Sequence, residues 1–295
     1  MNFALHGAER LPVGFLGIGM RHMYLEGELV SGGTLVDFVI SPRHRSVFPA
    51  LMLQRQGRAE ALDSMQILYG LPDTKAVAIC RRLESQLMFE LPRYVRVVRS
   101  VVYLERQLPR WLAVPLSGFV DALDQSGIWL QLRISPRVGE WVEEFDARFD
   151  RLWNQFDKSA LCVGLRNREF LRWRFSRQPA RSYRIFVVRS YYDASLLMYF
   201  VCEINSAILR VRDCLNIGSQ RDFKAGLLLL SREARRMGLK SVEVQISGPA
   251  GLRRTLARAQ FLVRSTRPFF AMVGQSLRDR AKSVRWYITP ADEDV

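Results

Sequence analysis

The segment Thr34–Gln56 constrains the fold most, because it combines the signatures of a strand, a turn and the start of a helix. Leu35–Ile40 is rich in β-branched and aromatic residues, which favour a strand. Pro42 has no N–H to give to a sheet ladder, so the strand is predicted to end near Ser41. Pro49 suits the first turn of a helix, and helix-forming residues follow it.

The turn in this segment is basic, with Arg43, His44 and Arg45 in succession. The first N–H groups of a helix have no partner within the helix, and the helix dipole is positive at that end. An anion is therefore expected in front of the turn. The sequence predicts a ligand that carries phosphate groups, although His44 fits an ordinary exposed loop position equally well.

A second unit of the same kind follows. Met65–Tyr69 is a short apolar strand, and Gly70 to Asp73 lead from it into a helix for which Asp73 is a suitable N-cap. Ala76, Ile79, Cys80 and Leu83 recur at helical spacing and predict one buried face. Before both units, 22–30 and 35–40 are predicted to form an antiparallel hairpin that turns at Ser31–Gly33.

The segment Arg45–Ala50 resembles the pyrophosphate loop of the acyl-CoA N-acyltransferase (GNAT) superfamily, Arg/Gln-x-x-Gly-x-Gly/Ala. Arg45 and Ala50 match this pattern, whereas Phe48 stands in place of the first glycine and Pro49 lies inside the loop. In this family a splayed strand presents backbone groups to the cofactor. The resemblance implies that acetyl-CoA, as acyl donor, is bound by Phe38, Val39, Ile40, Arg45, Ser46, Val47, Phe48, Pro49, Ala50 and Asp73.

The resemblance continues in the second unit, where the family commonly has Asn-x-x-Ala-x-x-Leu-Tyr. Asp73 stands for the Asn, Ala76 for the Ala, Ile79 for the Leu and Cys80 for the Tyr. That Tyr often protonates the departing CoA thiolate, so Cys80 becomes a candidate acid; a thiol on an amphipathic helix also fits core packing. Asp37 is the nearest candidate base, and its alternative role is that of a solvent-facing strand residue.

The order of elements repeats in the second half. Three strands are expected at 183–188, 196–204 and 208–215, followed by a helix at 223–237, a strand at 242–246 and a helix at 249–259. Before them, the aromatic spacing in 139–156 predicts one amphipathic helix. The prediction is an α/β (α+β) protein of two GNAT-like modules, each a mixed, mostly antiparallel sheet flanked by helices. The first module (1–107) is abbreviated before its hairpin, 108–136 connects the modules, and the second (137–295) has a degenerate CoA loop.

Composition limits the remaining classes. The chain has 44 Lys and Arg against 29 Asp and Glu, a net charge of +15, which favours anionic partners or simply solvated faces. Its four cysteines form no C-x-x-C pair and indicate reduced thiols, and no metal site is expected. No apolar run is long enough for a transmembrane helix, and a cytoplasmic location is expected.

The resemblance implies an acyl-CoA-dependent transfer to an amine-bearing small molecule, by direct attack on the thioester. More narrowly, the chain resembles acetyltransferase-like proteins associated with bacterial exopolysaccharide and protein-sorting gene clusters, which suggests an amino sugar as acceptor. Two alternatives remain open. One is a catalytically inactive scaffold or binding module of the same fold, and the other is a nucleic-acid-binding protein, for which no reader motif is present. The sequence does not specify the oligomeric state.

Overall fold

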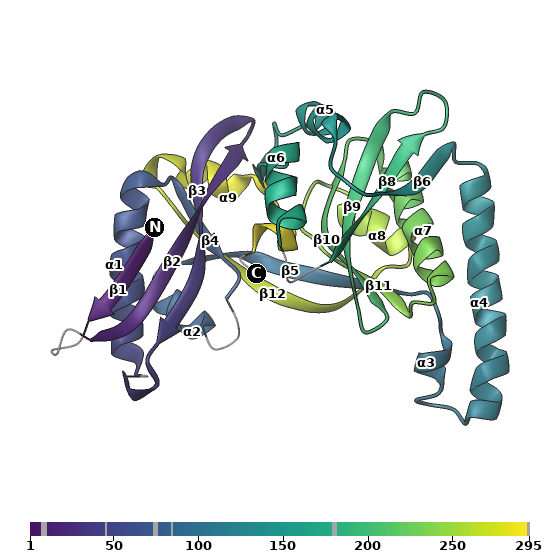
Figure 1. The fold of residues 1–295 in the computed structure, drawn as a ribbon, viewed down its shortest axis with the longest axis horizontal. Coiled ribbons are helices and arrows are strands. Elements are labelled where there is room, and N and C mark those ends of the chain that lie inside the picture. The colour runs from purple at the N-terminus through teal and green to yellow at the C-terminus, as the bar shows by residue number, and fades with distance from the viewer. Residues whose placement is uncertain (7–10, 45, 73–75, 84, 179–181, 294–295) are drawn as a thin grey trace.

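The computed structural model describes residues 1–6, 11–44, 46–72, 76–83, 85–178 and 182–293. Within these residues, thirteen strands belong to one sheet. Twelve run in the order β13-β7-β2-β3-β4-β12-β5-β11-β10-β9-β8-β6, and β1 pairs with the outer edge of β2. The sheet is elongated, with helices against it along its length (Figure 1).

The elements of the first half are β1 (Asn2–His6), β2 (Pro12–Leu25), β3 (Glu28–Ile40), α1 (Val47–Ser64), β4 (Ile67–Gly70), α2 (Val77–Arg82), β5 (Gln86–Val97), α3 (Val101–Leu104) and α4 (Arg110–Arg133). Those of the second half are β6 (Arg137–Val142), α5 (Ala147–Gln155), β7 (Leu161–Gly164), α6 (Arg168–Leu171), β8 (Tyr183–Ser190), β9 (Leu196–Asn205), β10 (Ile208–Asn216), α7 (Gln220–Arg236), β11 (Ser241–Gln245), α8 (Leu252–Arg258), β12 (Leu262–Val273), α9 (Arg278–Ser283) and β13 (Arg285–Tyr287). Short 3₁₀ turns include η4 (Pro290–Asp292).

The hairpin of β2 and β3 turns earlier than its sequence suggested. The turn is at Glu26 and Gly27, which have φ of 53° and 86°, whereas Ser31–Gly33 continue strand β3. Gly27 adopts the left-handed conformation at little cost. At Gly33 a Cβ would displace the sulfur of Met65, which packs directly against this glycine. The predicted turn position is therefore wrong, although the hairpin itself is present.

The two halves are interlocked at the centre of the sheet. β12 from the end of the chain lies between β4 and β5, and β5 lies between β12 and β11. The edge of the first half is also extended by the second half, because β7 pairs with β2 at Met23–Leu25. The halves consequently share one continuous hydrogen-bonded sheet.

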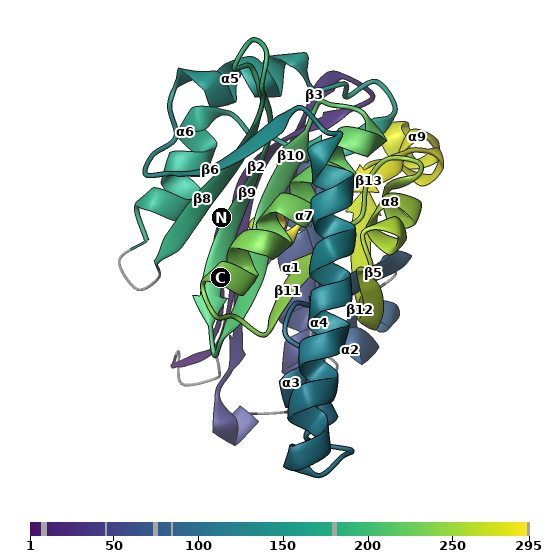
Figure 2. The same cartoon turned by 90° about the vertical axis from the view of Figure 1, so that its right-hand side faces the viewer.

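The core divides along the sheet. α1 covers one face of the first half, where Leu16, Ile40, Leu53 and Leu68 are buried together. On the opposite face, Tyr69, Phe269 and Trp286 belong to a second cluster. The largest cluster surrounds β8–β10 and helices α5 and α7 in the second half, and Figure 2 shows α4 standing outside α7.

The segment 139–156 is not a single helix. Trp141 lies in β6, where it pairs with Phe186 of β8, and α5 begins only at Ala147. Asp146 ends the extended segment and accepts a hydrogen bond from the backbone N–H of Arg148 at 2.8 Å, as an N-cap residue does. Pairing in the sheet and this cap together override the helical spacing of the aromatic residues.

Candidate acyl-donor cavity

Strands β3 and β4 separate soon after they meet. Their parallel pairing covers only Gly32–Thr34 with Ile67–Tyr69. Further along β3 a bulge interrupts its pairing with β2, since Gly17 pairs with Val36 while Phe15 pairs with Val39. Asp37 lies in this bulge with a φ of 47°. Bulges bend the strand that carries them, and this one lies where β3 diverges from β4.

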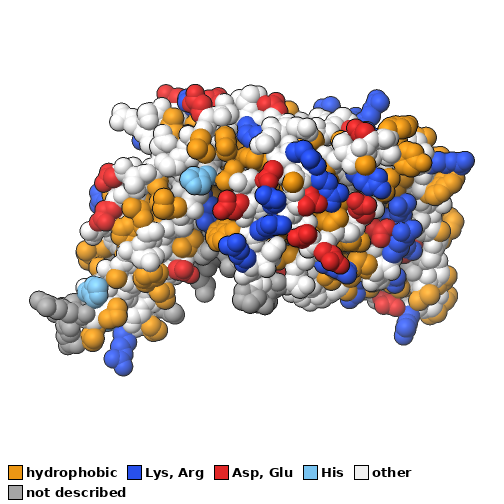
Figure 3. Space-filling model, turned by 45° about the horizontal axis from the view of Figure 1, so that its top comes forward, with side chains coloured by type: hydrophobic (Ala, Val, Ile, Leu, Met, Phe, Trp, Pro, Cys, Tyr) orange, Lys and Arg blue, Asp and Glu red, His pale blue; other side chains and the backbone are white. Residues whose placement is uncertain are grey.

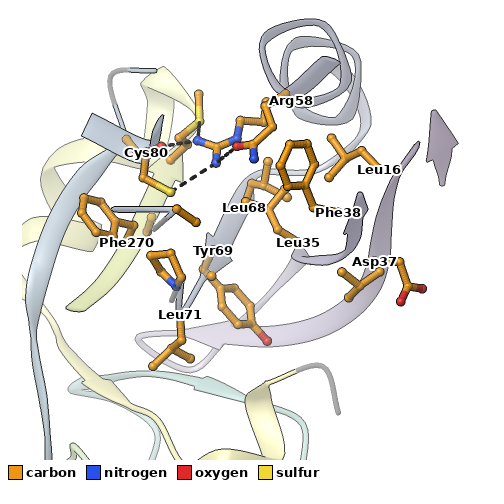
Figure 4. Close-up of a pocket in the computed structure, with 18 residues that line it drawn as sticks. Leu16, Leu35, Asp37, Phe38, Arg58, Leu68, Tyr69, Leu71, Cys80 and Phe270 are labelled. Carbon is orange, nitrogen blue, oxygen red and sulfur yellow. Dashed lines mark hydrogen bonds between the residues drawn. The ribbon is translucent and has the colours of Figure 1, made fainter. Parts of the chain in front are cut away.

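A cavity of about 280 Å³ lies at this divergence. Its walls are mostly apolar and come from β2, β3, β4, α1, α2 and β12 (Figure 4). Leu16, Leu35, Phe38, Leu68 and Phe270 supply much of the apolar wall. An apolar cavity with a few polar groups is typical of small-molecule sites.

The main charged group in the wall is Arg58, which the sequence reasoning missed. Arg58 is 2% exposed, and its Nη2 donates to Oε1 of Gln54, one helical turn earlier in α1, at 2.7 Å. It also contacts Sγ of Cys80 at 3.6 Å, Sδ of Met272 at 3.7 Å and the hydroxyl of Ser85. No carboxylate is among these acceptors, and Nε has no hydrogen-bond partner among the described residues. Burial lowers the pKa of this guanidinium, against a raising effect of Cys80.

The two candidate catalytic residues both line the cavity, at different sides of it. Cys80 is buried beside Arg58, whereas the exposed side chain of Asp37 lies at the far side and is directed away from both (Figure 4). Cys80 thus combines a packed position with access to the cavity. Asp37 is exposed on its strand, in agreement with the second role considered for it, that of a solvent-facing strand residue.

Tyr69 is a second residue that sequence reasoning missed. It lines the cavity from β4, and its hydroxyl donates to the backbone oxygen of Asp292 at 3.2 Å. Burial and the nearby Asp292 raise the pKa of this phenol, so it stays protonated at neutral pH. Tyr69 is the last residue with a large side chain in β4, directly before Gly70, and this position could have identified it from the sequence.

The predicted phosphate loop is only partly described. Arg45 and Asp73 lie outside the described residues. Ser46 is the N-cap of α1 without a side-chain capping bond, and the first turn contains no acidic residue. Val47 and Phe48 are exposed, Ala50 is buried, and Pro49 lies in the first turn as expected. The N-terminus of α1 therefore keeps its positive end uncompensated by a carboxylate of its own turn.

Of the three strand residues expected to present backbone groups, only Phe38 lines the cavity. Val39 is exposed, and Ile40 is buried in the cluster against α1. The loop residues 46–50 do not line the cavity either, since Gln54 and Arg58 reach it from further along α1. Val47 and Gln54 are seven positions apart on α1, which corresponds to roughly 10 Å along the helix.

The second half contains the same divergence of strands, but it is filled. β10 has a bulge between Val211 and Asp213, and its parallel pairing with β11 covers only Ile208–Val211. Ile288 forms an antiparallel bridge with Ser247, just beyond β11. On the other side Tyr287 donates to the backbone oxygen of Cys214 at 2.5 Å. The C-terminal segment Tyr287–Asp292 therefore occupies the gap between these strands.

The start of α7 also differs from that of α1. Ser219 and Asp222 form a capping box, in which the Asp222 carboxylate accepts the backbone N–H of Ser219 at 2.9 Å. A cavity of about 340 Å³ adjoins this end of the helix, lined by Gln220, Asn216 and Tyr287 among others. A carboxylate in the first turn already compensates the helix dipole and occupies the backbone N–H of Ser219. This end of the second half is thus less suited to an anion than the start of α1.

No protein-family model and no curated protein sequence matches this chain. Solved structures do match. An N-acetyltransferase of the GCN5-related type from Anabaena variabilis has a TM-score of 0.63 at 14% identity, over 92% of this chain and 62% of that one. A probable N-acyltransferase from Enterococcus faecalis gives 0.62 at 11% identity, over 92% and 61%. N-myristoyltransferase from Saccharomyces cerevisiae, with myristoyl-CoA bound, gives 0.53 at 10% identity, over 91% and 69%.

The chain therefore has a GNAT-like fold, an α/β arrangement with a large mixed sheet flanked by helices. It spans about six-tenths of the length of the first two structures. Within the part of the chain that the structure describes, no helix is long and apolar enough to cross a membrane. The same residues contain no cluster of His, Cys, Asp and Glu that could hold a metal ion.

Proposed function

We propose that this protein is an acyl-CoA-dependent N-acyltransferase that binds its donor in the first-half cavity. The observation that carries the proposal is the contrast between two similar strand divergences. The one between β3 and β4 opens into an apolar cavity, whereas the one between β10 and β11 contains Tyr287–Asp292. A cavity remains beside this second divergence, but it adjoins a helix start that Asp222 already caps, whereas the first turn of α1 has no acidic residue. On this proposal the chain consists of two GNAT-like modules, and only the first accepts a donor.

The two ends of an acyl-CoA differ in chemistry, and so do the two ends of this site. Phosphates would bind at the N-terminus of α1, where free N–H groups and the helix dipole favour anions, together with Arg45. The uncharged pantetheine arm and the thioester would lie in the cavity, where Arg58 can donate to a carbonyl oxygen. The fold likeness to N-acetyltransferases and to an N-myristoyltransferase with bound myristoyl-CoA supports an acyl-CoA as the donor.

The reaction would be a direct attack of a neutral amine on the thioester carbonyl. The new C–N bond forms, the C–S bond breaks, the nitrogen loses a proton and the departing thiolate gains one. Asp37 is the proposed proton acceptor, and Cys80 is the proposed donor to the thiolate. Acetyl-CoA and an amino sugar are the proposed donor and acceptor, in the cytoplasm.

Calorimetric titration with acetyl-CoA and with longer acyl-CoAs tests this proposal. Binding in the micromolar range is expected, together with its loss in Arg45→Ala. The matched control is Arg55→Ala, since Arg55 is exposed on α1 and does not line the cavity. If the folded protein binds none of these donors, the enzyme proposal is wrong, and a binding module or scaffold of the same fold remains.

The distribution of charge gives the nucleic-acid alternative little support. Basic and acidic side chains are interleaved over the middle of the face in Figure 3 and do not form one continuous basic stripe there. Many arginines are engaged in ion pairs, such as Arg137 with Asp222 and Arg235 with Asp121, both at 2.8 Å. An affinity for nucleic acid that falls steeply with salt would favour the nucleic-acid alternative over the acyltransferase proposal.

A further inference from the structure

Helix α4 carries its most apolar stripe on the side that faces away from the protein. Five large residues of α4 and the residue that follows its last turn form this outer stripe: Leu112, Leu116, Phe119, Leu123, Leu130 and Ile134. Phe119, Leu123 and Leu130 are 63%, 59% and 62% exposed. Soluble monomers rarely leave so long a contiguous apolar stripe in water.

The orientation of α4 is fixed by its other side. Asp121 pairs with Arg235 at 2.8 Å and accepts the backbone N–H of Ser100 at 3.0 Å. Asp124 pairs with the buried Arg96 at 2.6 Å. These contacts direct the inner side of the helix toward the protein, so the outer stripe cannot turn inward. Figure 1 shows α4 at one end of the molecule, and Figure 2, viewed from that end, shows it in front of α7.

The spacing of the outer stripe is that of a helix-to-helix seam. Leu112, Leu116, Phe119 and Leu123 follow one another at intervals of four, three and four residues, and Leu130 lies one heptad beyond Leu123. Such spacing suits packing against a second helix, whose side chains fit between these residues.

The charges on α4 argue against a membrane as the occupant. Between Arg110 and Arg133 the only charged residues are Asp121 and Asp124, both engaged with the protein body. Helices that bind anionic membranes carry Lys and Arg along their polar flanks. This helix has basic residues at its ends only, so an uncharged protein surface is the better complement.

We propose that the outer stripe is the interface of a homodimer in which the two α4 helices pack antiparallel about a two-fold axis. With the axis at the level of Asp121, Phe119 of each copy faces Leu123 of the other, and Leu112 faces Leu130. Antiparallel packing places opposite ends of the helix dipoles together, whereas parallel packing would bring the two copies of Arg110 together.

The available area is sufficient for this interface. α4 has 24 residues, a length of roughly 36 Å. The six stripe residues and the exposed Trp111 and Trp129 beside them can bury on the order of 600 Å² per copy, about 1,200 Å² in total, the lower end of the range for specific interfaces. Each copy carries a net charge of +15. Salt screens the resulting repulsion, so association should not weaken when salt is raised.

Sedimentation velocity of the full chain over the micromolar range tests the proposal. The wild type is expected to dimerise, and Phe119→Glu and Leu123→Glu are each expected to weaken dimerisation at least about 100-fold, since both residues lie at the centre of the interface. Leu29→Glu is the matched control, because Leu29 is equally exposed but lies in β3 of the first half. Circular dichroism should show folded protein in every variant, as none of these side chains is buried in the monomer.

A mixing experiment tests the antiparallel register. Phe119→Glu and Leu123→Lys should each be monomeric alone, but an equal mixture should form a dimer, because the carboxylate introduced in one variant faces the ammonium group introduced in the other. A wild type that stays monomeric throughout the range overturns the proposal, as does a dimer that both Glu substitutions leave intact. Binding of a monomeric wild type to phosphatidylglycerol vesicles, lost in Phe119→Glu and weakened by salt, also overturns it and assigns the stripe to a membrane.

Discussion

The guanidinium of Arg166 lies 3.1 Å from Oδ1 of Asp213, and both side chains are fully buried. Arg166 also pairs with Asp292, and Asp213 accepts hydrogen bonds from Thr289 and Tyr199 at 2.7 Å each. This network connects β10 to the C-terminal segment that fills the second divergence of strands. The C-terminal segment is thus held in the gap between β10 and β11 by specific polar contacts as well as by packing.

Arg166→Met should destabilise the protein by about 3–5 kcal/mol, because it leaves two buried carboxylates without their cation. Burial alone would lower the pKa of Arg166, but Asp292 and Asp213 raise it well above its ordinary value, so the charge is present at any working pH. Urea denaturation measures the change. Arg168→Met is the matched control: its partner is Asp150, both side chains are substantially exposed, and a loss of no more than about 1 kcal/mol is expected.

Equal losses for these two variants would contradict the central role given to the Arg166 network. The comparison is informative because the two arginines are close in sequence and differ mainly in burial.

Gly70→Leu should block donor binding while leaving the protein folded. Gly70 lines the cavity, and a Cβ there would meet the side chain of Leu35 at 3.6 Å, an ordinary contact. A larger side chain would extend into the space that the pantetheine arm needs. Calorimetry should show acetyl-CoA binding weakened at least about tenfold, or about 1.4 kcal/mol.

Val39→Leu is the control for this filling experiment, because Val39 is exposed and does not line the cavity. A Gly70→Leu protein that is folded and binds acetyl-CoA normally would show that the donor lies elsewhere.

The fold was largely predictable from the sequence, whereas the site was only partly so. The strand, loop and helix at Leu35–Gln54, and the strand and helix β10 and α7 of the second half, follow from local propensity, which can be read from the sequence. The interlocking of β12 with β4 and β5 joins residues some two hundred positions apart, and no local pattern encodes it. The same limit applies to the filling of the second divergence by Tyr287–Asp292.

Arg58 shows why the cavity itself was not predictable. On α1 its neighbours in sequence are Gly57 and Ala59, and nothing distinguishes it from the many exposed arginines of the chain. Its burial arises only because α1, α2 and β12 come together around it, bringing Cys80 and Met272 to its guanidinium. Cys80 became a candidate through the family resemblance, and its helical spacing predicted a buried position, which the structure confirms. Neither signal indicated the cavity beside it.

Arg58→Met should weaken acetyl-CoA binding about tenfold or more, since hydrogen bonds from a charged donor contribute about 1.5–3 kcal/mol. Methionine fills a similar volume without donating. The exposed Arg55, three residues earlier on the same helix, provides the control Arg55→Met, which should bind as the wild type does. Equal affinities for the wild type and both variants would remove Arg58 from the proposed site.

Alkylation of Cys80 should report directly on occupancy of the cavity. Cys162, Cys202 and Cys214 are buried, and burial raises the pKa of each thiol, so all three should resist iodoacetamide in the folded protein. Cys80 lines the cavity and should therefore react faster than the others, as peptide mass spectrometry can establish. Acetyl-CoA at saturating concentration should slow this reaction at least about tenfold by excluding the reagent.

Desulfo-CoA, which lacks the thioester, is the control ligand for this experiment. Protection of Cys80 by both ligands would place the pantetheine arm beside Cys80, and protection by neither would contradict the proposed position of the donor.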